Sequence, residues 1–261
     1  MKTELIVECA SNHGGERAWQ ERFIDNAAEA GCDYLKVQSY QTAHLSPADP
    51  QYAWLQKAEL SDADHERLIR RCESAGIQFL TTVYTADRVP FLASLGLKAI
   101  KIGSGEAMNV PLLEAVAAHP WKVYVSTGLV TEADLERCRM IFALAPVTFL
   151  HCVSQYPTPV DQVNMGRMGW LVSKTLRPAG YSDHTTENDA AWMAMVQGAA
   201  CVEVHHSDPS APRCQTWDKS AFDLKWIAQM RHDIAAMKVK RPMTWGEDDP
   251  RPYVGRWQVG V

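Results

Sequence analysis

Hydrophobic positions along the chain follow two spacings in turn, and this pattern predicts eight strands that alternate with helices. Short apolar runs of strand length are followed by stretches in which apolar residues recur every three to four positions. The predicted strands are Glu4 to Cys9, Tyr34 to Gln38, Ile77 to Val83, Ala99 to Ile102, Val123 to Ser126, Val147 to Cys152, Leu176 to Ala179 and Ala199 to Val202. The predicted helices are residues 16–30, 61–74, 86–95, 110–118, 131–143, 163–174, 188–197 and 222–237.

This alternation predicts a parallel sheet, because a helix must carry the chain back between consecutive strands. Eight strand–helix units in about 240 residues favour a closed (β/α)8 TIM barrel over an open sheet. We therefore expect a single α/β domain over residues 1–240 and a C-terminal tail over residues 241–261. Ser61 to Asp64 has the composition of a helix start, and Gly76 that of a helix end. The stretch from Ser39 to Leu60 is expected to be a long loop without regular structure.

Composition restricts the classes of protein that fit. The chain has 261 residues, 46% of them hydrophobic and 22% charged, and a net charge of -5. The absence of a basic run argues against nucleic acid as a partner. No apolar run approaches the ~20 residues of a membrane helix, and the N-terminal sequence is not a signal peptide. The seven cysteines include no Cys-x-x-Cys pair, which favours reduced thiols in a cytoplasmic protein.

Two histidines stand close to the ends of the last two predicted strands. His184 belongs to Gly180-Tyr181-Ser182-Asp183-His184-Thr185, and His205 to Val202-Glu203-Val204-His205-His206. The C-terminal ends of parallel strands face the same way, so both imidazoles are expected to reach one metal ion. A single histidine at a strand end is usually only hydrogen-bonded. Two of them, each with an acidic residue nearby, indicate a metal site.

Further polar residues fall at the other predicted strand ends. They are Glu8, Lys36, Thr82, Lys101, Ser104, Glu106, Ser126, Ser154 and Ser182. Lysines and hydroxyls that meet at one barrel mouth indicate a pocket for a phosphate or a carboxylate. The alternative interpretation is that each lysine neutralises a buried glutamate. His151 and Cys152 do not form a nucleophile pair, because neighbouring residues of a strand point to opposite faces.

Taken together and in this order, these stretches resemble the N-acetylneuraminate (sialic acid) synthase family. The similarity covers about residues 4–208. The matching stretches are Val7-Glu8 with Asn12-His13-Gly14-Gly15, Lys36-Val37-Gln38, Leu60-Ser61 with Asp64, Lys101-Ile102-Gly103-Ser104-Gly105, Ser126-Thr127-Gly128, His151-Cys152 with Tyr156-Pro157-Thr158-Pro159, Tyr181-Ser182-Asp183-His184-Thr185, and Glu203 with His205.

The resemblance implies a barrel that condenses phosphoenolpyruvate with a sugar aldehyde and releases phosphate. By resemblance, His184 and His205 hold a divalent ion, typically Mn²⁺. Glu8 and Glu106 serve proton transfer and water positioning, and Glu203 lies near the acceptor. The residues expected around phosphoenolpyruvate are Lys36, Thr82, Lys101, Ser104, Ser126, Ser154 and Ser182. Ser154 stands where relatives often carry asparagine.

Two departures from the family concern the acceptor. Members usually continue into an antifreeze-like domain that donates an arginine to the partner's acceptor site, and we expect that domain to be absent here. The family's Pro-Gly-Pro-Asp loop is replaced by Pro209-Ser210-Ala211-Pro212-Arg213. Arg213 is therefore a candidate for binding an anionic group of the acceptor, and the alternative is a solvated loop residue. The resemblance thus defines the donor better than the acceptor.

Two other functions remain open at this point. One is a pyruvate aldolase in which Lys36 or Lys101 forms a Schiff base. The other is a non-catalytic barrel that binds a sugar acid or a partner protein. The tail from residue 238 to 261, with Trp245, Tyr253 and Trp257, is expected either to pack on the barrel or to meet a second subunit in a homodimer.

Overall fold

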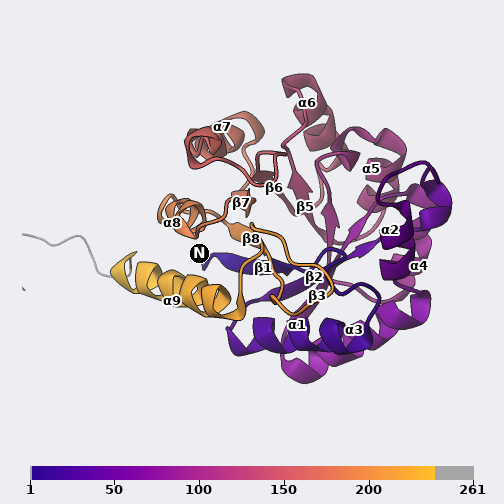
Figure 1. The fold of residues 1–261 in the computed structure, drawn as a ribbon. Coiled ribbons are helices and arrows are strands. Elements are labelled where there is room, and N and C mark those ends of the chain that lie inside the picture. Colours follow the sequence, from indigo (N-terminus) through magenta and orange to yellow (C-terminus); the bar gives the residue numbers. More distant parts are fainter. Residues whose placement is uncertain (1, 239–261) are drawn as a thin grey trace, which may run out of the picture.

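The computed structural model describes residues 2–238, and their eight parallel strands form a closed barrel (Figure 1). Strand order around the barrel follows the sequence from β1 to β8, and β8 pairs with β1. This confirms the (β/α)8 fold. The strands are β1 (Glu4–Glu8), β2 (Tyr34–Ser39), β3 (Gln78–Val83), β4 (Ala99–Ile102), β5 (Lys122–Ser126), β6 (Val147–His151), β7 (Ala179–Asp183) and β8 (Cys201–His205).

Helices surround the barrel as an outer ring (Figure 1). The ring consists of α1 (Arg17–Glu29), α3 (Asp62–Ala75), α4 (Val89–Ser94), α5 (Val110–Ala117), α6 (Glu132–Ile141), α7 (Gly166–Thr175), α8 (Asp189–Val196) and α9 (Ala221–Lys238), and the short helix α2 (Tyr52–Ala58) lies in the segment after β2. The start of α3 has the predicted cap: Ser61 and Asp64 bind each other's backbone N–H groups, and Gly76 ends the helix at a φ of 73°. The predicted tail, residues 241–261, lies outside the described residues.

Two successive layers of the barrel interior shape its mouth, because every second residue of a strand points inward. The lower layer is apolar and consists of Ile6, Tyr34, Leu80, Ala99, Tyr124, Leu150 and Cys201. Two residues later on the same strands stand Glu8, Lys36, Thr82, Lys101, Ser126, Cys152 and Glu203. The apolar layer thus closes the barrel from below and leaves the polar layer above it as the floor of a mouth.

The last two strands begin later than predicted. Leu176 was expected in a strand, but it ends α7 with a φ of 55° and is 87% exposed. β7 and β8 instead run through Ser182, Asp183, Glu203 and His205, which the sequence pattern placed at or beyond the strand ends. Their polar side chains are tolerated inside a strand because they find buried partners in the barrel.

The predicted loop from Ser39 to Leu60 was also wrong in part, because it contains the short helix α2. Contacts with distant segments hold this helix. The Tyr40 hydroxyl donates a hydrogen bond to the carbonyl of Leu55 at 2.9 Å, and Trp54 Nε1 donates to Ser11 Oγ at 2.8 Å. The segment therefore lies against the loop that follows β1, at the same end of the barrel as the polar layer.

Two other expectations can be compared with residues 2–238. All seven cysteines lie in this range and are free, as expected for reduced thiols, and only Cys214 is exposed. Within the same range, no helix is both long enough and apolar enough to cross a membrane.

Candidate functional site

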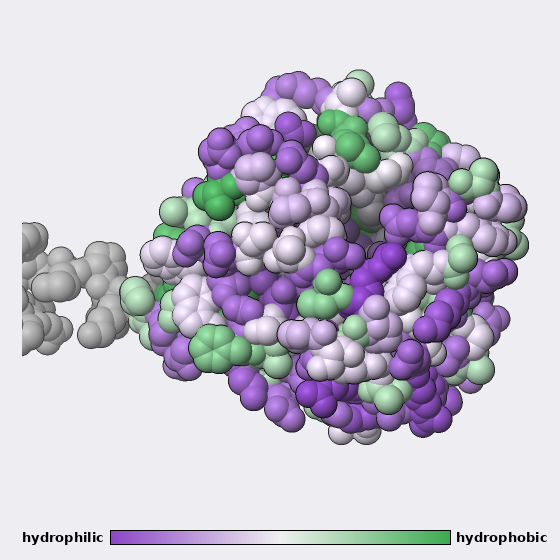
Figure 2. Space-filling view, viewed as in Figure 1, coloured by the Kyte–Doolittle hydropathy of each residue, from purple (hydrophilic) through white to green (hydrophobic). Residues whose placement is uncertain are grey.

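One cavity of about 260 Å³ gathers most of the residues that the sequence singled out. A hollow is also visible near the middle of the face shown in Figure 2, bordered by residues of both polar and apolar character. The predicted residues that line the cavity are Glu8, Lys36, Thr82, Lys101, Ser104, Ser126, Ser154, Ser182, His184, Glu203 and His205. They come from all eight strands or the loops directly after them, which is the arrangement expected at the C-terminal face of such a barrel.

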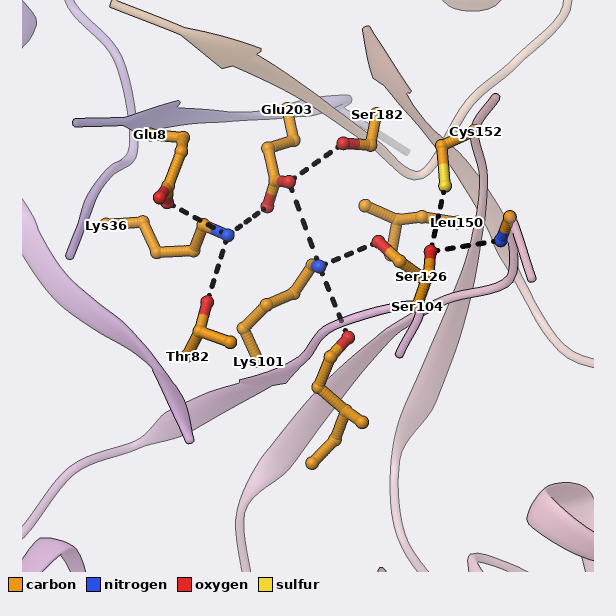
Figure 3. A network of polar contacts seen from close by, with 12 residues as sticks. Glu8, Lys36, Thr82, Lys101, Ser104, Ser126, Leu150, Cys152, Ser182 and Glu203 are labelled. Atoms are coloured by element: carbon orange, nitrogen blue, oxygen red, sulfur yellow. Dashed lines mark hydrogen bonds and ion pairs between the residues drawn. The ribbon is translucent and has the colours of Figure 1, made fainter. Parts of the chain in front are cut away.

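Lys36 lies among Glu8, Thr82 and Glu203 on the floor of the cavity (Figure 3). Its Nζ is 2.9 Å from Glu8 Oε2 and 3.1 Å from Glu203 Oε2, and it donates a hydrogen bond to Thr82 Oγ1 at 3.1 Å. Burial would lower the pKa of Lys36, but the two carboxylates outweigh it and the pKa is raised. Lys36 is therefore a permanently charged residue whose three donors are already occupied.

Lys101 forms a longer ion pair than Lys36 does. Its Nζ donates to Ser126 Oγ at 2.7 Å and to the carbonyl of Ile102 at 3.3 Å, and it is 3.8 Å from Glu203 Oε1 (Figure 3). Burial is the main influence on its pKa, which is lowered. Of the two lysines, Lys101 has the longer ion pair, so an additional anion in the cavity would stabilise its charge more than that of Lys36.

The pKa of Glu8 and that of Glu203 are shifted in opposite directions. Burial raises the pKa of Glu8, and Lys36 opposes this only in part. Burial would also raise the pKa of Glu203, but Lys101 and Lys36 overcome it, helped by a 2.8 Å hydrogen bond from Ser182 Oγ, and the pKa is lowered. Both lysines pair with buried glutamates, as the alternative interpretation of the sequence proposed. The cluster of two cations and two carboxylates has no net charge.

The two histidines meet on the β7–β8 side of the cavity, each two residues beyond Ser182 or Glu203. The ring centroids of His184 and His205 are 5.3 Å apart; His184 is buried and His205 is partly exposed. His184 Nδ1 is 2.7 Å from the carbonyl of Val153, which can only accept, so Nδ1 carries the proton and Nε2, which lies 3.5 Å from Ser182 Oγ, carries the lone pair. Burial lowers the pKa of both rings, and for His205 the neighbouring His184 lowers it further. Both imidazoles are therefore neutral.

This donor set fits a divalent metal ion. Metal-binding histidines are neutral and usually donate their second ring N–H to a carbonyl or a carboxylate, as His184 does. Asp183 is not a third ligand: its Oδ1 accepts hydrogen bonds from the backbone N–H and the hydroxyl of Thr185, and its side chain lies on the outer face of β7. Two imidazoles would leave several coordination positions for substrates and water.

A third part of the cavity consists of hydroxyls and a thiol. Ser104 Oγ accepts a hydrogen bond from the backbone N–H of Gly128 at 3.0 Å and lies 3.3 Å from Cys152 Sγ (Figure 3). A Cβ atom at Gly128 would be 2.9 Å from Cys152 Sγ and would collide with Ser154 Oγ. Glycine is thus required here because any side chain would fill this corner.

Two predicted residues are not among those that line the cavity. Glu106 follows β4, and its Oε2 occupies the place of a missing side chain, because a Cβ atom on Gly103 would be 2.5 Å from it. Burial raises the pKa of Glu106. Arg213 stacks on Trp54 with its guanidinium carbon 4.4 Å from the ring centroid, and it donates to Gln51 Oε1 at 3.1 Å. It joins two loops at the edge of the barrel.

Sequence reasoning missed two residues that matter for the shape of the cavity. Cys152 could have been found by alternation, because Leu150 faces the interior and the residue two places later must do so as well. Tyr156 gave no such signal, since it lies in a loop. Its ring centroid is 4.1 Å from that of His184 and 5.8 Å from that of His205, so it covers the histidine pair.

The chain was then compared with known proteins. The NeuB family matches residues 23–240. Two curated N,N'-diacetyllegionaminic acid synthases are each 32% identical, that of Campylobacter jejuni over 224 residues and that of Legionella pneumophila over 234. These alignments cover 78% and 80% of this chain but only 67% and 65% of the relatives. The crystal structure of a sialic acid synthetase from Leptospira borgpetersenii superposes with a TM-score of 0.86 at 26% identity, over 94% of this chain and 87% of that one.

Proposed function

The chain belongs to the NeuB family, and we propose that it condenses phosphoenolpyruvate with a sugar aldehyde to give a 2-keto-3-deoxy sugar acid and phosphate. The observation that carries this proposal is that two buried lysines and two neutral histidines line one cavity. The lysines suit an anionic donor, and the histidines suit a metal ion beside an aldehyde. The chain spans about two thirds of its curated relatives, so the acceptor is treated as a separate question.

The donor would bind at Lys101 and the hydroxyl corner. Phosphoenolpyruvate carries a phosphate and a carboxylate, and both need cationic or hydroxyl donors in a buried site. Lys101, Ser126 and Ser104 are such donors and line the same cavity; Lys101 bonds Ser126, and Ser104 is held by the N–H of Gly128 (Figure 3). Lys36 and Thr82 would contribute from the other side, where Lys36 already compensates Glu8 and Glu203.

The acceptor's aldehyde would lie next to the histidine pair. His184 and His205 would hold the divalent ion, which we propose to be Mn²⁺, and a bound ion supplies positive charge that polarises the carbonyl. Tyr156 packs on both rings and would keep bulk water away from the reacting atoms. Because the ordinary acceptor loop of the family is replaced, we propose an N-acetylmannosamine-like or related aldose without naming it further.

The reaction needs one proton acceptor and one water molecule. C3 of phosphoenolpyruvate forms a bond to the aldehyde carbon, whose oxygen takes up a proton and becomes a hydroxyl. Water adds to C2 and gives up one proton, and loss of phosphate from C2 together with the second proton leaves the ketone. Glu8, whose pKa is raised by burial, is suited to take the proton from this water. Glu106 has the same pKa shift and is the alternative base if the water enters from the β4 side.

A phosphate-release assay tests the proposal directly. Phosphoenolpyruvate and Mn²⁺ are incubated with the protein and a panel of aldoses and N-acyl sugars. We expect phosphate release that requires an aldehyde and that stops when a chelator removes the metal. Failure of every aldehyde in the panel, with a folded protein, would contradict the proposed reaction.

One observation supports a second candidate, a Schiff-base aldolase. Burial lowers the pKa of Lys101, and a neutral amine is what attack on a pyruvate carbonyl requires. Treatment with borohydride in the presence of pyruvate separates the two chemistries. A stable mass increase on Lys101 would favour the aldolase, whereas an unmodified protein that releases phosphate favours the condensation.

A further inference from the structure

A single buried lysine connects the ends of the two strands that carry the histidines. Lys219 lies between β8 and α9 and is only 1% exposed. Its backbone is attached to the end of β8: the N–H donates to the carbonyl of His205 at 2.8 Å. Its own carbonyl lies 2.6 Å from His206 Nδ1 and accepts from the N–H of Ser207 at 3.3 Å. The position of its Cα is therefore fixed relative to His205.

The side chain of Lys219 reaches across to the end of β7. Its Nζ donates to the carbonyl of Thr185 at 2.8 Å and to that of Glu187 at 2.7 Å, and it is 3.5 Å from Asp183 Oδ2. These three acceptors lie on both sides of His184 in the sequence. An ammonium group has three donors, so all of them are directed to this one segment.

The segment has few other means of satisfying these groups. Asp183 is 0% exposed, and its Oδ2 has no hydrogen-bond partner among residues 2–238, so the charge of Lys219 is what compensates it. An uncompensated carboxylate in this position would be strongly unfavourable. An apolar residue in place of Lys219 would leave Asp183 Oδ2 without its counter-charge and the carbonyl of Thr185 without this donor, while Asp183 Oδ1 and the carbonyl of Glu187 would keep their bonds to Thr185.

Because one residue is attached to both strand ends, we infer that Lys219 is a positioning residue that sets the spacing of His184 and His205. This inference rests on the proposed function in so far as the histidines hold a metal ion. Lys219 touches neither ring with its side chain and does not line the cavity. It acts through the backbone of His205 on one side and through the segment 183–187 on the other.

The experiment compares Lys219→Met with a matched control. Methionine has a similar length but no donors, and Lys219→Gln is a second variant that keeps a shorter, uncharged donor. The control is Lys225→Met, which makes the same change at an exposed residue of α9 whose only ion pair here is a 3.4 Å contact with Glu29. Folding is checked by circular dichroism. The readouts are Mn²⁺ affinity by calorimetry, phosphoenolpyruvate affinity in a chelator, and hydrogen exchange of the peptide over residues 183–188.

We expect Lys219→Met to weaken Mn²⁺ binding by about tenfold or more, the range found when groups that orient metal ligands are removed. Exchange of the 183–188 amides should become faster. Phosphoenolpyruvate affinity without metal should change less than twofold, because Lys36 and Lys101 do not contact this segment. Lys225→Met should match the wild type in all three measurements. If the Met variant does not fold, the same results are expected of Lys219→Gln, with a smaller loss of affinity.

Two outcomes distinguish the positioning role from the proposed metal site. Wild-type Mn²⁺ affinity and unchanged exchange in a folded Lys219 variant would overturn the inference and leave the proposed function intact. If the wild type itself does not bind Mn²⁺, the metal site is refuted, and the exchange data decide alone. Faster exchange then supports Lys219 as the residue that holds the strand ends, and unchanged exchange overturns it.

Discussion

Replacing Lys101 by methionine removes the ammonium group while preserving the length of the side chain. The fold should tolerate this change because the remaining groups stay paired. Glu203 keeps its hydrogen bond from Ser182 at 2.8 Å and its ion pair with Lys36 at 3.1 Å. Ser126 loses one partner but retains a hydroxyl that can bind a substrate or water. The effect of the variant should therefore fall on the anion that enters the cavity.

The size of the effect follows from two contributions with the same sign. Loss of one hydrogen bond between a charged donor and an anion costs ~1.5–3 kcal/mol, which corresponds to roughly 10- to 150-fold in a binding constant. In addition, the cluster changes from neutral to a net charge of -1, since Lys36 alone must then balance Glu8 and Glu203. This negative charge opposes phosphoenolpyruvate further, so at least a tenfold rise of its apparent Michaelis constant is expected.

Initial rates of phosphate release measure this constant at a saturating aldehyde, and a second series at saturating phosphoenolpyruvate measures the constant of the acceptor. Lys98→Met is the control, because Lys98 is an exposed residue directly before the same strand. The acceptor constant should change much less than the donor constant. A donor constant within twofold of the wild type, in a variant with an unchanged circular dichroism spectrum, would remove Lys101 from the donor site and refute the reasoning.

The remaining predictions use the same protein. His184→Ala and His205→Ala should each abolish turnover and weaken Mn²⁺ binding in calorimetry, and full metal occupancy in the double variant would contradict the metal site. Gly128→Ala should raise the apparent Michaelis constant of phosphoenolpyruvate at least tenfold, because its methyl group would lie 2.9 Å from the thiol of Cys152. Unchanged kinetics would place the phosphate elsewhere. Burial lowers the pKa of His13 to about 4, and its Nδ1 accepts a hydrogen bond from the N–H of Gly15, so the folded state favours the neutral ring. The unfolded chain then binds the proton first as the pH falls from ~6.5 to ~4, and the free energy of unfolding should decrease by about 2 kcal/mol between pH 7 and pH 5 from this residue alone. Urea titrations should show that His13→Gln reduces this dependence, and an equal slope in both proteins would show that His13 does not titrate in this window.

The barrel and the lysines of the cavity could be predicted because they depend on local patterns. Strand alternation decides which residues face the interior, and it places Lys36 and Lys101 above the apolar layer whatever the distant partners are. Helix starts such as Ser61 with Asp64 are equally local, because the cap is formed within four residues. These features need only the sequence within one element and the knowledge that the sheet is parallel.

The last two strands could not be placed correctly by the same criteria. The apolar runs end at Ala179 and at Val202, so Ser182 and Glu203 were predicted at or beyond the strand ends. They are strand residues because each has a partner from another strand: Ser182 bonds Glu203, and Glu203 pairs with Lys36 and Lys101. The partners are between 21 and 167 residues away in the sequence, and no local pattern reports them.

In the loop after β8, too, the sequence could not show which basic residue is buried. Arg213 and Lys219 are both basic and lie six residues apart, and the sequence favoured Arg213 because a guanidinium suits an anionic acceptor. In the structure, Arg213 lies on Trp54 at the barrel's edge, whereas Lys219 is buried against Asp183. Burial decides their roles: a partly exposed arginine can leave its ring contact at little cost, but a buried ammonium cannot leave its carboxylate. Asp183 is thereby committed to Lys219, which leaves the two histidines as the protein's candidate ligands for the proposed metal ion.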